Sequence, residues 1–144
     1  MKKVIYLLLF VTIAACGKKG TDTVAPDAAS TVAGTYEVSS LRQTSSGGTS
    51  VTFTLPTSTT NAGVVTTLSG QLTTTKKTST TVGIVFLLKA TGQADSPTDL
   101  GTFEVKGSDL YSGTTKTGTA DGTNLNLDVT DSKGTRAVIV SKKK

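Results

Sequence analysis

The chain has 144 residues, a formal net charge of +5 and 30 threonines, with one cysteine and no histidine or tryptophan. Without histidine, the chain lacks Ser-His and Cys-His nucleophile activation and His-ligated zinc or iron sites. We therefore expect a protein that is not an enzyme and that uses neither a metal nor a cofactor. The excess lysines lie near the chain ends and are not interleaved with aromatic residues, which argues against nucleic-acid binding.

Residues 1–15 have the pattern of an export signal. Lys2 and Lys3 precede an apolar run at residues 4–11, and small residues follow it. The run is shorter than the about 20 apolar residues that a membrane-spanning helix needs. We therefore predict a signal peptide that is removed by cleavage.

The only cysteine falls at the predicted cleavage point. Ile13-Ala14-Ala15-Cys16 resembles the lipobox of bacterial lipoproteins at all four positions. That resemblance implies a diacylglyceryl group on the Cys16 sulfur, cleavage before Cys16 and acylation of the new amine, so that two or three acyl chains hold the protein at a membrane. The alternative is an ordinary secretory signal whose cysteine is incidental. Lipidation would leave no thiol for a disulfide, a metal or catalysis.

Residue 17 is glycine. In enterobacterial lipoproteins an aspartate at this position favours retention in the inner membrane, so the resemblance implies a cell-envelope protein anchored in the outer membrane of a Gram-negative bacterium. Removal of residues 1–15 leaves 129 residues, enough for one domain. Loss of Lys2 and Lys3 lowers the formal charge by 2, to +3.

Residues 16–33 predict a lipidated cysteine followed by a flexible tether, because they are small, polar and contain a proline. Within it, Asp22-Thr23-Val24 resembles a short O-glycosylation signal of some Gram-negative envelope proteins, which makes Thr23 a possible acceptor.

Residues 34–144 predict an all-β domain. Threonine favours strands, and no stretch after residue 16 has helical periodicity. The connections are too short for parallel crossovers, so about eight strands would form an antiparallel meander that closes into a small barrel. An outer-membrane barrel is excluded, because aromatic girdles and lipid-facing apolar residues are missing. The expected strands are residues 34–44, 49–55, 63–75, 79–91, 100–106, 109–116, 123–130 and 135–141.

The predicted domain resembles the lipocalin-like domains of small bacterial lipoproteins. Gly34-Thr35-Tyr36 opens the first strand where that superfamily has Gly-x-Trp, and residues 121–143 form a similar closing hairpin. Lipocalins pack a basic side chain from the last strand over that tryptophan. The resemblance implies that Arg136, at the start of the last strand, packs over Tyr36.

Alternation along the strands predicts an inner apolar face, which leaves two interpretations open. The face could line a pocket for a small apolar or amphipathic ligand, with Tyr36 fixing the polar end of the ligand. It could equally be the filled core of a structural or interaction lipoprotein whose surface meets an envelope protein or a glycan. The candidate lining residues are Tyr36, Val38, Phe53, Ile84, Phe86, Leu88, Phe103, Val105, Leu125 and Leu127, and Val51 and Val129 fall on the same face.

Replacement of Cys16 by Ser tests the anchor. We expect the protein to move from the membrane pellet to the soluble fraction, because the sulfur that would carry the diacylglyceryl group is gone. Fractionation and immunoblotting measure this, with Gly17→Ala as the control that should still pellet. A Cys16→Ser protein that pellets as the parent does would contradict the predicted lipidation.

Overall fold

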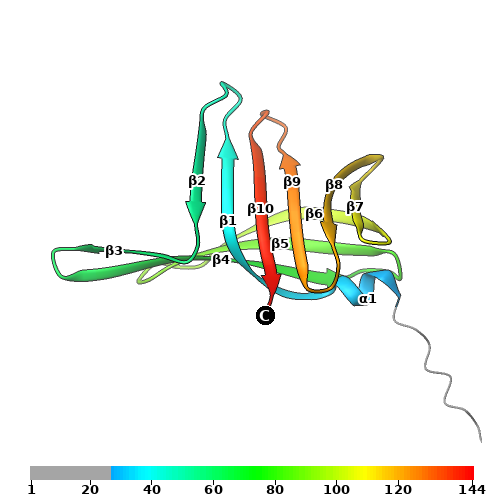
Figure 1. Ribbon diagram of the computed structural model, residues 1–144, viewed down its shortest axis with the longest axis horizontal. Coiled ribbons are helices and arrows are strands. Elements are labelled where there is room, and N and C mark those ends of the chain that lie inside the picture. The colour runs from blue at the N-terminus through cyan, green and yellow to red at the C-terminus, as the bar shows by residue number, and fades with distance from the viewer. Residues whose placement is uncertain (1–26) are drawn as a thin grey trace, which may run out of the picture.

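A computed structural model describes residues 27–144, which form one short helix and ten antiparallel strands (Figure 1). The predicted signal peptide, Cys16 and Thr23 lie outside the described residues. The elements are α1 (Ala28–Val32), β1 (Gly34–Thr44), β2 (Ser50–Thr54), β3 (Thr57–Asn61), β4 (Val64–Lys76), β5 (Thr81–Ala90), β6 (Ser96–Lys106), β7 (Asp109–Ser112), β8 (Thr115–Ala120), β9 (Asn124–Thr130) and β10 (Arg136–Lys143).

The strands close into a ring. Their order is β2-β1-β10-β9-β8-β7-β6-β5-β4-β3, and β1 also pairs with β4. This additional pairing closes the sheet into an eight-stranded barrel that consists of β1 and the seven strands β4–β10. Strands β2 and β3 lie outside the barrel as edge strands. The expected all-β antiparallel meander that closes into a barrel is confirmed.

Strand β1 belongs to two pairings on one side. Its residues 34–38 pair with β4, whereas residues 40–44 pair with β2, and a bulge lies between Val38 and Ser40. Because a bulge bends a strand and increases its local twist, β1 turns away from β4 at this point. In Figure 1, β1 and β2 stand upright while β3 and β4 run across the view.

The strands differ from the expectation in three places. The strand expected at residues 100–106 begins four residues earlier, at Ser96. The predicted strand at residues 109–116 is two strands, β7 and β8, separated by a turn at Gly113, whose φ of 60° favours glycine. Strand β3 was not expected, because Thr57–Asn61 is polar at every position and gives no alternation to detect. It pairs with β4 through a tight turn at Ala62 and Gly63, whose φ angles are both positive.

Apolar side chains from every ring strand form one core inside the barrel. Burial of apolar surface contributes about 25 cal/mol per Å², so this cluster is the main source of stability. The buried members on the ring strands are Tyr36, Val38, Leu72, Val82, Ile84, Phe103, Val105, Leu110, Ala120, Leu125, Leu127 and Ile139.

Helix α1 covers one end of the barrel, so the predicted tether does not extend to residue 33. Ala29 and Val32 are buried, and the Tyr36 hydroxyl donates a hydrogen bond of 2.6 Å to the Val32 carbonyl. Asp27 caps the helix by accepting a bond of 2.8 Å from the Ser30 N–H. A helix of five residues with two buried side chains is too short to give a periodic signal in the sequence.

The turn from β8 to β9 lies against this helix. The carboxylate of Asp121 accepts bonds from the Asn124 side chain at 3.0 Å and from the N–H groups of Asn124 at 2.6 Å and Thr123 at 2.8 Å. These bonds lower the pKa of Asp121 from 3.8 to about 2. Next to it, a Cβ added at Gly122 would lie 3.1 Å from Thr31 Cγ2 of α1.

Asp121→Asn should destabilise the protein near neutral pH, and the difference from the parent should shrink in acid. The pKa of Asp121 is lowered in the folded state, so its contribution is present above the unfolded pKa and is lost as the pH falls toward about 2. Urea unfolding of both proteins at a series of pH values from about 6 to 2 measures the difference. A difference that stays constant over this range would contradict the role of the carboxylate.

Candidate functional site

Seven of the ten candidate lining residues lie in the packed core. Their side chains are between 0% and 3% exposed, and they belong to one contiguous cluster. These residues are Tyr36, Val38, Ile84, Phe103, Val105, Leu125 and Leu127. Side chains therefore fill the part of the barrel that α1 covers.

The other three candidates lie toward the opposite end of the barrel. Phe86 and Leu88 are half-buried on β5, whereas Phe53 on β2 is 39% exposed and its neighbour Val51 is 50% exposed. The expectation that Val51 and Phe53 are inside the barrel is therefore wrong. Their strand lies outside the ring, so the opposite side of the barrel does not cover them.

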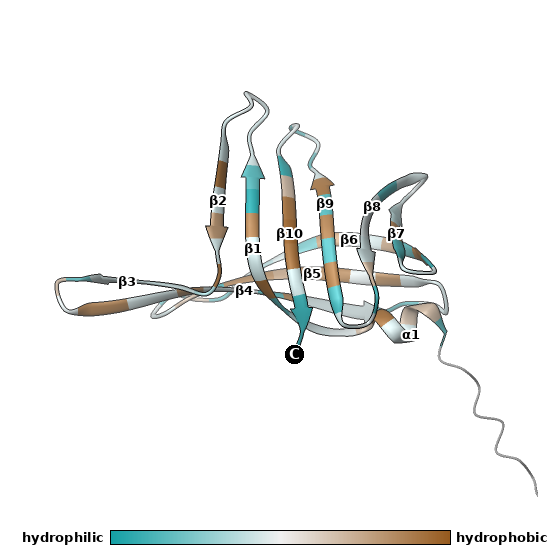
Figure 2. Ribbon diagram, viewed as in Figure 1, coloured by the Kyte–Doolittle hydropathy of each residue, from teal (hydrophilic) through white to brown (hydrophobic). Residues whose placement is uncertain are grey.

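Phe53 nevertheless faces the same way as the core. Phe53 pairs with Leu41, Leu41 with Ile139, and Ile139 with Leu127 across four neighbouring strands. Directly opposed residues share one face of an antiparallel sheet. Figure 2 shows apolar bands on these strands, and we call Phe53, Leu41, Ile139 and Leu127 the apolar row.

Exposure rises along the apolar row. Leu127 and Ile139 are 1% and 2% exposed, Leu41 is half-buried and Phe53 is 39% exposed. Further half-buried apolar side chains pack against the core where the ring strands run away from α1. These are Leu68 on β4, Phe86 on β5, Leu100 on β6 and Val129 on β9. We call this end of the barrel, with the exposed part of the apolar row, the open end.

A hollow of about 420 Å³ borders the open end. Gln43, Ser45, Thr49, Val51 and Thr135 line it. Gln43 pairs with Val51, so both lie on the face of the apolar row. The hollow thus sets hydroxyl and amide groups beside an exposed apolar side chain, and its volume falls in the usual range of ligand sites.

Other hollows lie on the barrel surface. One, of about 190 Å³, is at the seam of β1 and β4, where Glu37, Gln71, Lys89 and Lys144 line it with Val38, Pro56, Ser69 and Gly70. A second, of about 340 Å³, lies between β8 and β9, where their pairing ends at Gly118 and Leu127. Two more, of about 420 Å³ and 140 Å³, lie along β7, β8 and β9 and along β4, β5 and β6. Apolar side chains from the open end line none of these four.

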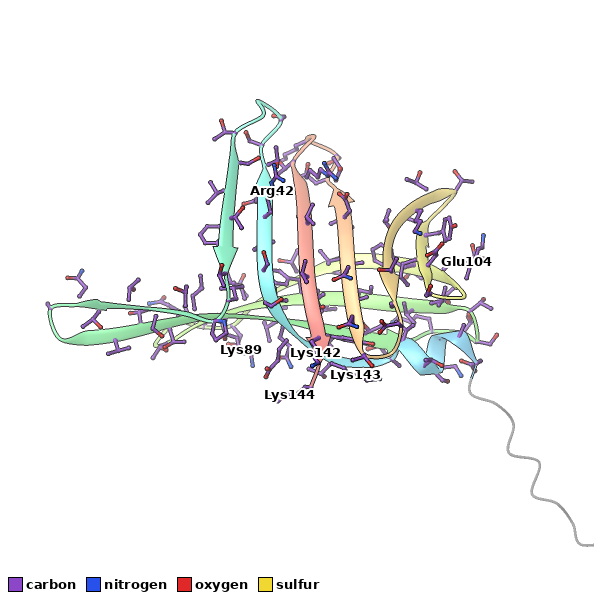
Figure 3. The ribbon with its side chains drawn as sticks, viewed as in Figure 1. Arg42, Lys89, Glu104, Lys142, Lys143 and Lys144 are labelled. Carbon is purple, nitrogen blue, oxygen red and sulfur yellow. The ribbon has the colours of Figure 1, made fainter. Side chains whose placement is uncertain are left out.

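Lys143 has the contact that was predicted for Arg136. Its ammonium lies 5.8 Å from the centre of the Tyr36 ring and donates a bond of 3.3 Å to the Thr31 carbonyl of α1. Arg136 is at the other end of β10, where its Nε bonds to Asp128 at 2.7 Å. In Figure 3, Lys143 lies beside the C-terminus, near α1, and Arg42 lies at the opposite end of the sheet.

Sequence reasoning missed Leu41 and Lys143. The bulge at Ser39 reverses the alternation set by Tyr36 and Val38, so a regular strand would point Leu41 outward. Lys143 lies between two other lysines, and only the alternation from the buried Ile139 and Ser141 marks it as inward-facing. That signal was available once the register of β10 was known.

Comparison with known proteins adds the fold alone. The chain matches no family model and no curated protein at a significant level. A solved structure of a redesigned β-barrel is similar, with 17% identity, a TM-score of 0.50, and coverage of 83% of this chain and 97% of that chain. Another redesigned barrel, mFAP1 bound to DFHBI, has 19% identity, a TM-score of 0.46 and coverage of 82% and 99%.

Two features are missing from residues 27–144, the part of the chain that the structure describes. In this part of the chain no helix is long and apolar enough to cross a membrane. The same residues contain no group of three or more His, Cys, Asp or Glu side chains that could hold a metal ion.

The contact of Lys143 with Tyr36 and α1 can be tested by comparing Lys143→Ala with Arg136→Ala. Lys143→Ala removes a cation–π contact and a bond to α1, each of which contributes about 1 kcal/mol. Arg136→Ala removes an exposed ion pair, whose contribution is about 0.5 kcal/mol. Urea unfolding should therefore show the larger loss for Lys143→Ala. Equal losses would mean that Lys143 does not hold α1 on the barrel.

Proposed function

We propose that the protein is a lipid-anchored component of the cell envelope that binds a small apolar or amphipathic molecule at the open end of its barrel. The observation that carries this proposal is the apolar row, which continues the core face out to Phe53, where the side chain is 39% exposed. Because an exposed apolar face gains free energy when a ligand covers it, this is where an apolar molecule would bind.

The filled core limits how such a ligand lies. Tyr36 bonds to Val32 and is fully buried, so it cannot hold the polar end of a ligand as first expected. An amphipathic molecule would instead lie across Leu41 and Phe53 and place its polar end in the hollow formed by Gln43 and its neighbours. The site is thus shallow and accessible from solvent.

The arrangement around Tyr36 supports a lipocalin-like barrel. A basic side chain of the last strand, Lys143, lies over the aromatic ring of Tyr36 in Gly34-Thr35-Tyr36. This matches the lipocalin pattern in kind, with Tyr and Lys at the positions concerned.

The position of Cys16 in the sequence indicates which end of the barrel a lipid anchor would hold toward the membrane. Ten residues, 17–26, lie between Cys16 and Asp27, which caps α1. At roughly 3.3 Å per residue, the eleven steps from Cys16 to Asp27 span at most about 36 Å. On this proposal, a lipid on Cys16 would hold the α1 end toward the membrane, and the open end would point away from it.

Displacement of a fluorescent fatty-acid analogue by a fatty-acid panel tests the ligand site, with the full Cys16→Ser chain free of detergent. Phe53→Asp should weaken binding of the analogue by about tenfold or more, since a charge replaces an apolar contact worth at least about 1.4 kcal/mol. Val140→Asp is the matched control, because Val140 is 43% exposed and lies on the other face of β10 from Ile139.

The proposal fails if the analogue does not bind, or if Phe53→Asp binds it as tightly as Val140→Asp does. In that case the second candidate gains support. The filled core favours a structural or interaction lipoprotein, whose barrel carries a surface for an envelope protein or a glycan.

A further inference from the structure

Strand β2 is short and has a free edge without charges or prolines. It pairs with β1 on one side only, and all five of its residues are exposed. Ser50–Thr54 contains no charged residue and no proline. Native edge strands are commonly protected by charges, prolines or bulges, because an unpaired edge invites another strand to pair with it.

The register of β2 shows which backbone groups face the free edge. Ser45 N–H donates to the Thr49 carbonyl and Leu55 N–H to the Ser39 carbonyl, both at 2.9 Å, so the odd-numbered residues bond to β1. Alternate residues of an antiparallel strand direct their backbone groups to the other side. The N–H and C=O groups of Ser50, Thr52 and Thr54 therefore point away from β1.

We propose that β2 pairs antiparallel with β2 of a second copy of this chain, about a two-fold axis at Thr52. In this register Thr52 lies opposite the partner's Thr52, and Ser50 lies opposite the partner's Thr54. All three outward-pointing residues then have backbone partners. On the face of the apolar row, Val51 lies opposite the partner's Phe53, so both exposed apolar side chains gain an apolar neighbour.

The self-complementary sequence favours a second copy over an unrelated strand. An interface about a two-fold axis uses the same patch on both subunits, and β2 offers Val51 and Phe53 symmetrically about Thr52. The other edge strand, β3, also has five exposed residues, but Thr57–Asn61 has no apolar side chain to pair. Pairing about Thr59 would thus bring only polar side chains together.

The proposed interface is small, so we expect it to form mainly where copies of the chain are held close together. Two five-residue strands bury far less than the about 1,200 Å² of a stable interface, so the free chain should associate weakly. Confinement to one surface raises the effective concentration of neighbouring copies. The pairing does not require the proposed ligand, because its hydrogen bonds join backbone groups at the edge of β2, although the Phe53 side chain contributes to both sites.

Disulfide trapping tests the proposed register. In the full Cys16→Ser chain, which has no other cysteine, Thr52→Cys places two thiols opposite each other at the axis. The Cα separation of such a pair is about 5.5 Å, within the range that a disulfide spans. Under mild oxidation we expect dimers of Thr52→Cys to form about tenfold faster than dimers of the matched control Thr59→Cys on β3.

Two further variants fix the register. Ser50→Cys or Thr54→Cys alone should cross-link slowly, whereas a mixture of the two should cross-link quickly, because residue 50 lies opposite the partner's residue 54. Addition of Thr52→Pro to both chains should slow the mixture, since it removes only an N–H that points away from β1. Equal rates for Thr52→Cys and Thr59→Cys, or Ser50→Cys as fast as the mixture, would overturn the pairing.

The same samples separate this inference from the proposed function. Thr52 alternates with Val51 and Phe53, so its side chain is on the other face, and Thr52→Pro should leave fatty-acid analogue binding unchanged. Cross-linking of Thr52→Cys no faster than that of Thr59→Cys, with intact analogue binding, would overturn the pairing alone. Intact cross-linking without analogue binding would overturn the ligand site alone.

Discussion

The whole architecture depends on the short pairing between β1 and β4. Residues 34–38 of β1 close the ring, and the last rung joins Val38 to Gly70. A Cβ at Gly70 would lie 3.0 Å from the Val38 Cβ and 3.0 Å from Leu55 Cδ1, so a larger residue would require these neighbours to shift by a few tenths of an ångström. Glycine at this position lets the backbones approach closely enough for the ring to close.

The same junction determines where the barrel opens. After the bulge at Ser39, β1 leaves β4 and pairs with β2, so the sheet continues while the opposite side of the barrel no longer covers it. The apolar row crosses this boundary, which explains its gradient from buried Leu127 to exposed Phe53. Closure at one end and exposure at the other are thus two results of one bulge, and the proposed ligand face is the part of the core face that the closure leaves uncovered.

Alternation in the sequence predicted the regular parts of this fold. Ile84, Leu125 and Leu127 lie in the core as expected, because their strands are regular and covered on that face. Alternation predicts on which face of the sheet a side chain lies but not whether other strands cover that face. Phe53 was therefore predicted on the correct face but wrongly predicted to be buried. Alternation also does not reveal where a bulge inserts an extra residue into a strand. For this reason the inward orientation of Leu41 was not predicted.

The pairing between strands far apart in the sequence was the other part of the fold that could not be predicted from the sequence. Which basic residue meets Tyr36 depends on how β10 is aligned with β1, and Arg136 and Lys143 are at opposite ends of β10. The alignment pairs Tyr36 with Lys143 and Thr44 with Arg136. A basic side chain of β10 therefore lies over Tyr36, but that it is Lys143 and not Arg136 followed only from the register.

The threonine-rich composition connects the fold to the behaviour of its edges. Threonine satisfies strand propensity without adding charge, so β2 and β3 are both well formed and unprotected. Their length of five residues limits the number of backbone bonds that either edge can offer to another chain. A short, uncharged edge pairs only weakly with another chain in dilute solution. Pairing becomes extensive only when copies are held close together, which is the condition that a lipid anchor would create. In β3 the same backbone edge lacks apolar side chains, so any preference between the two edges comes from Val51 and Phe53.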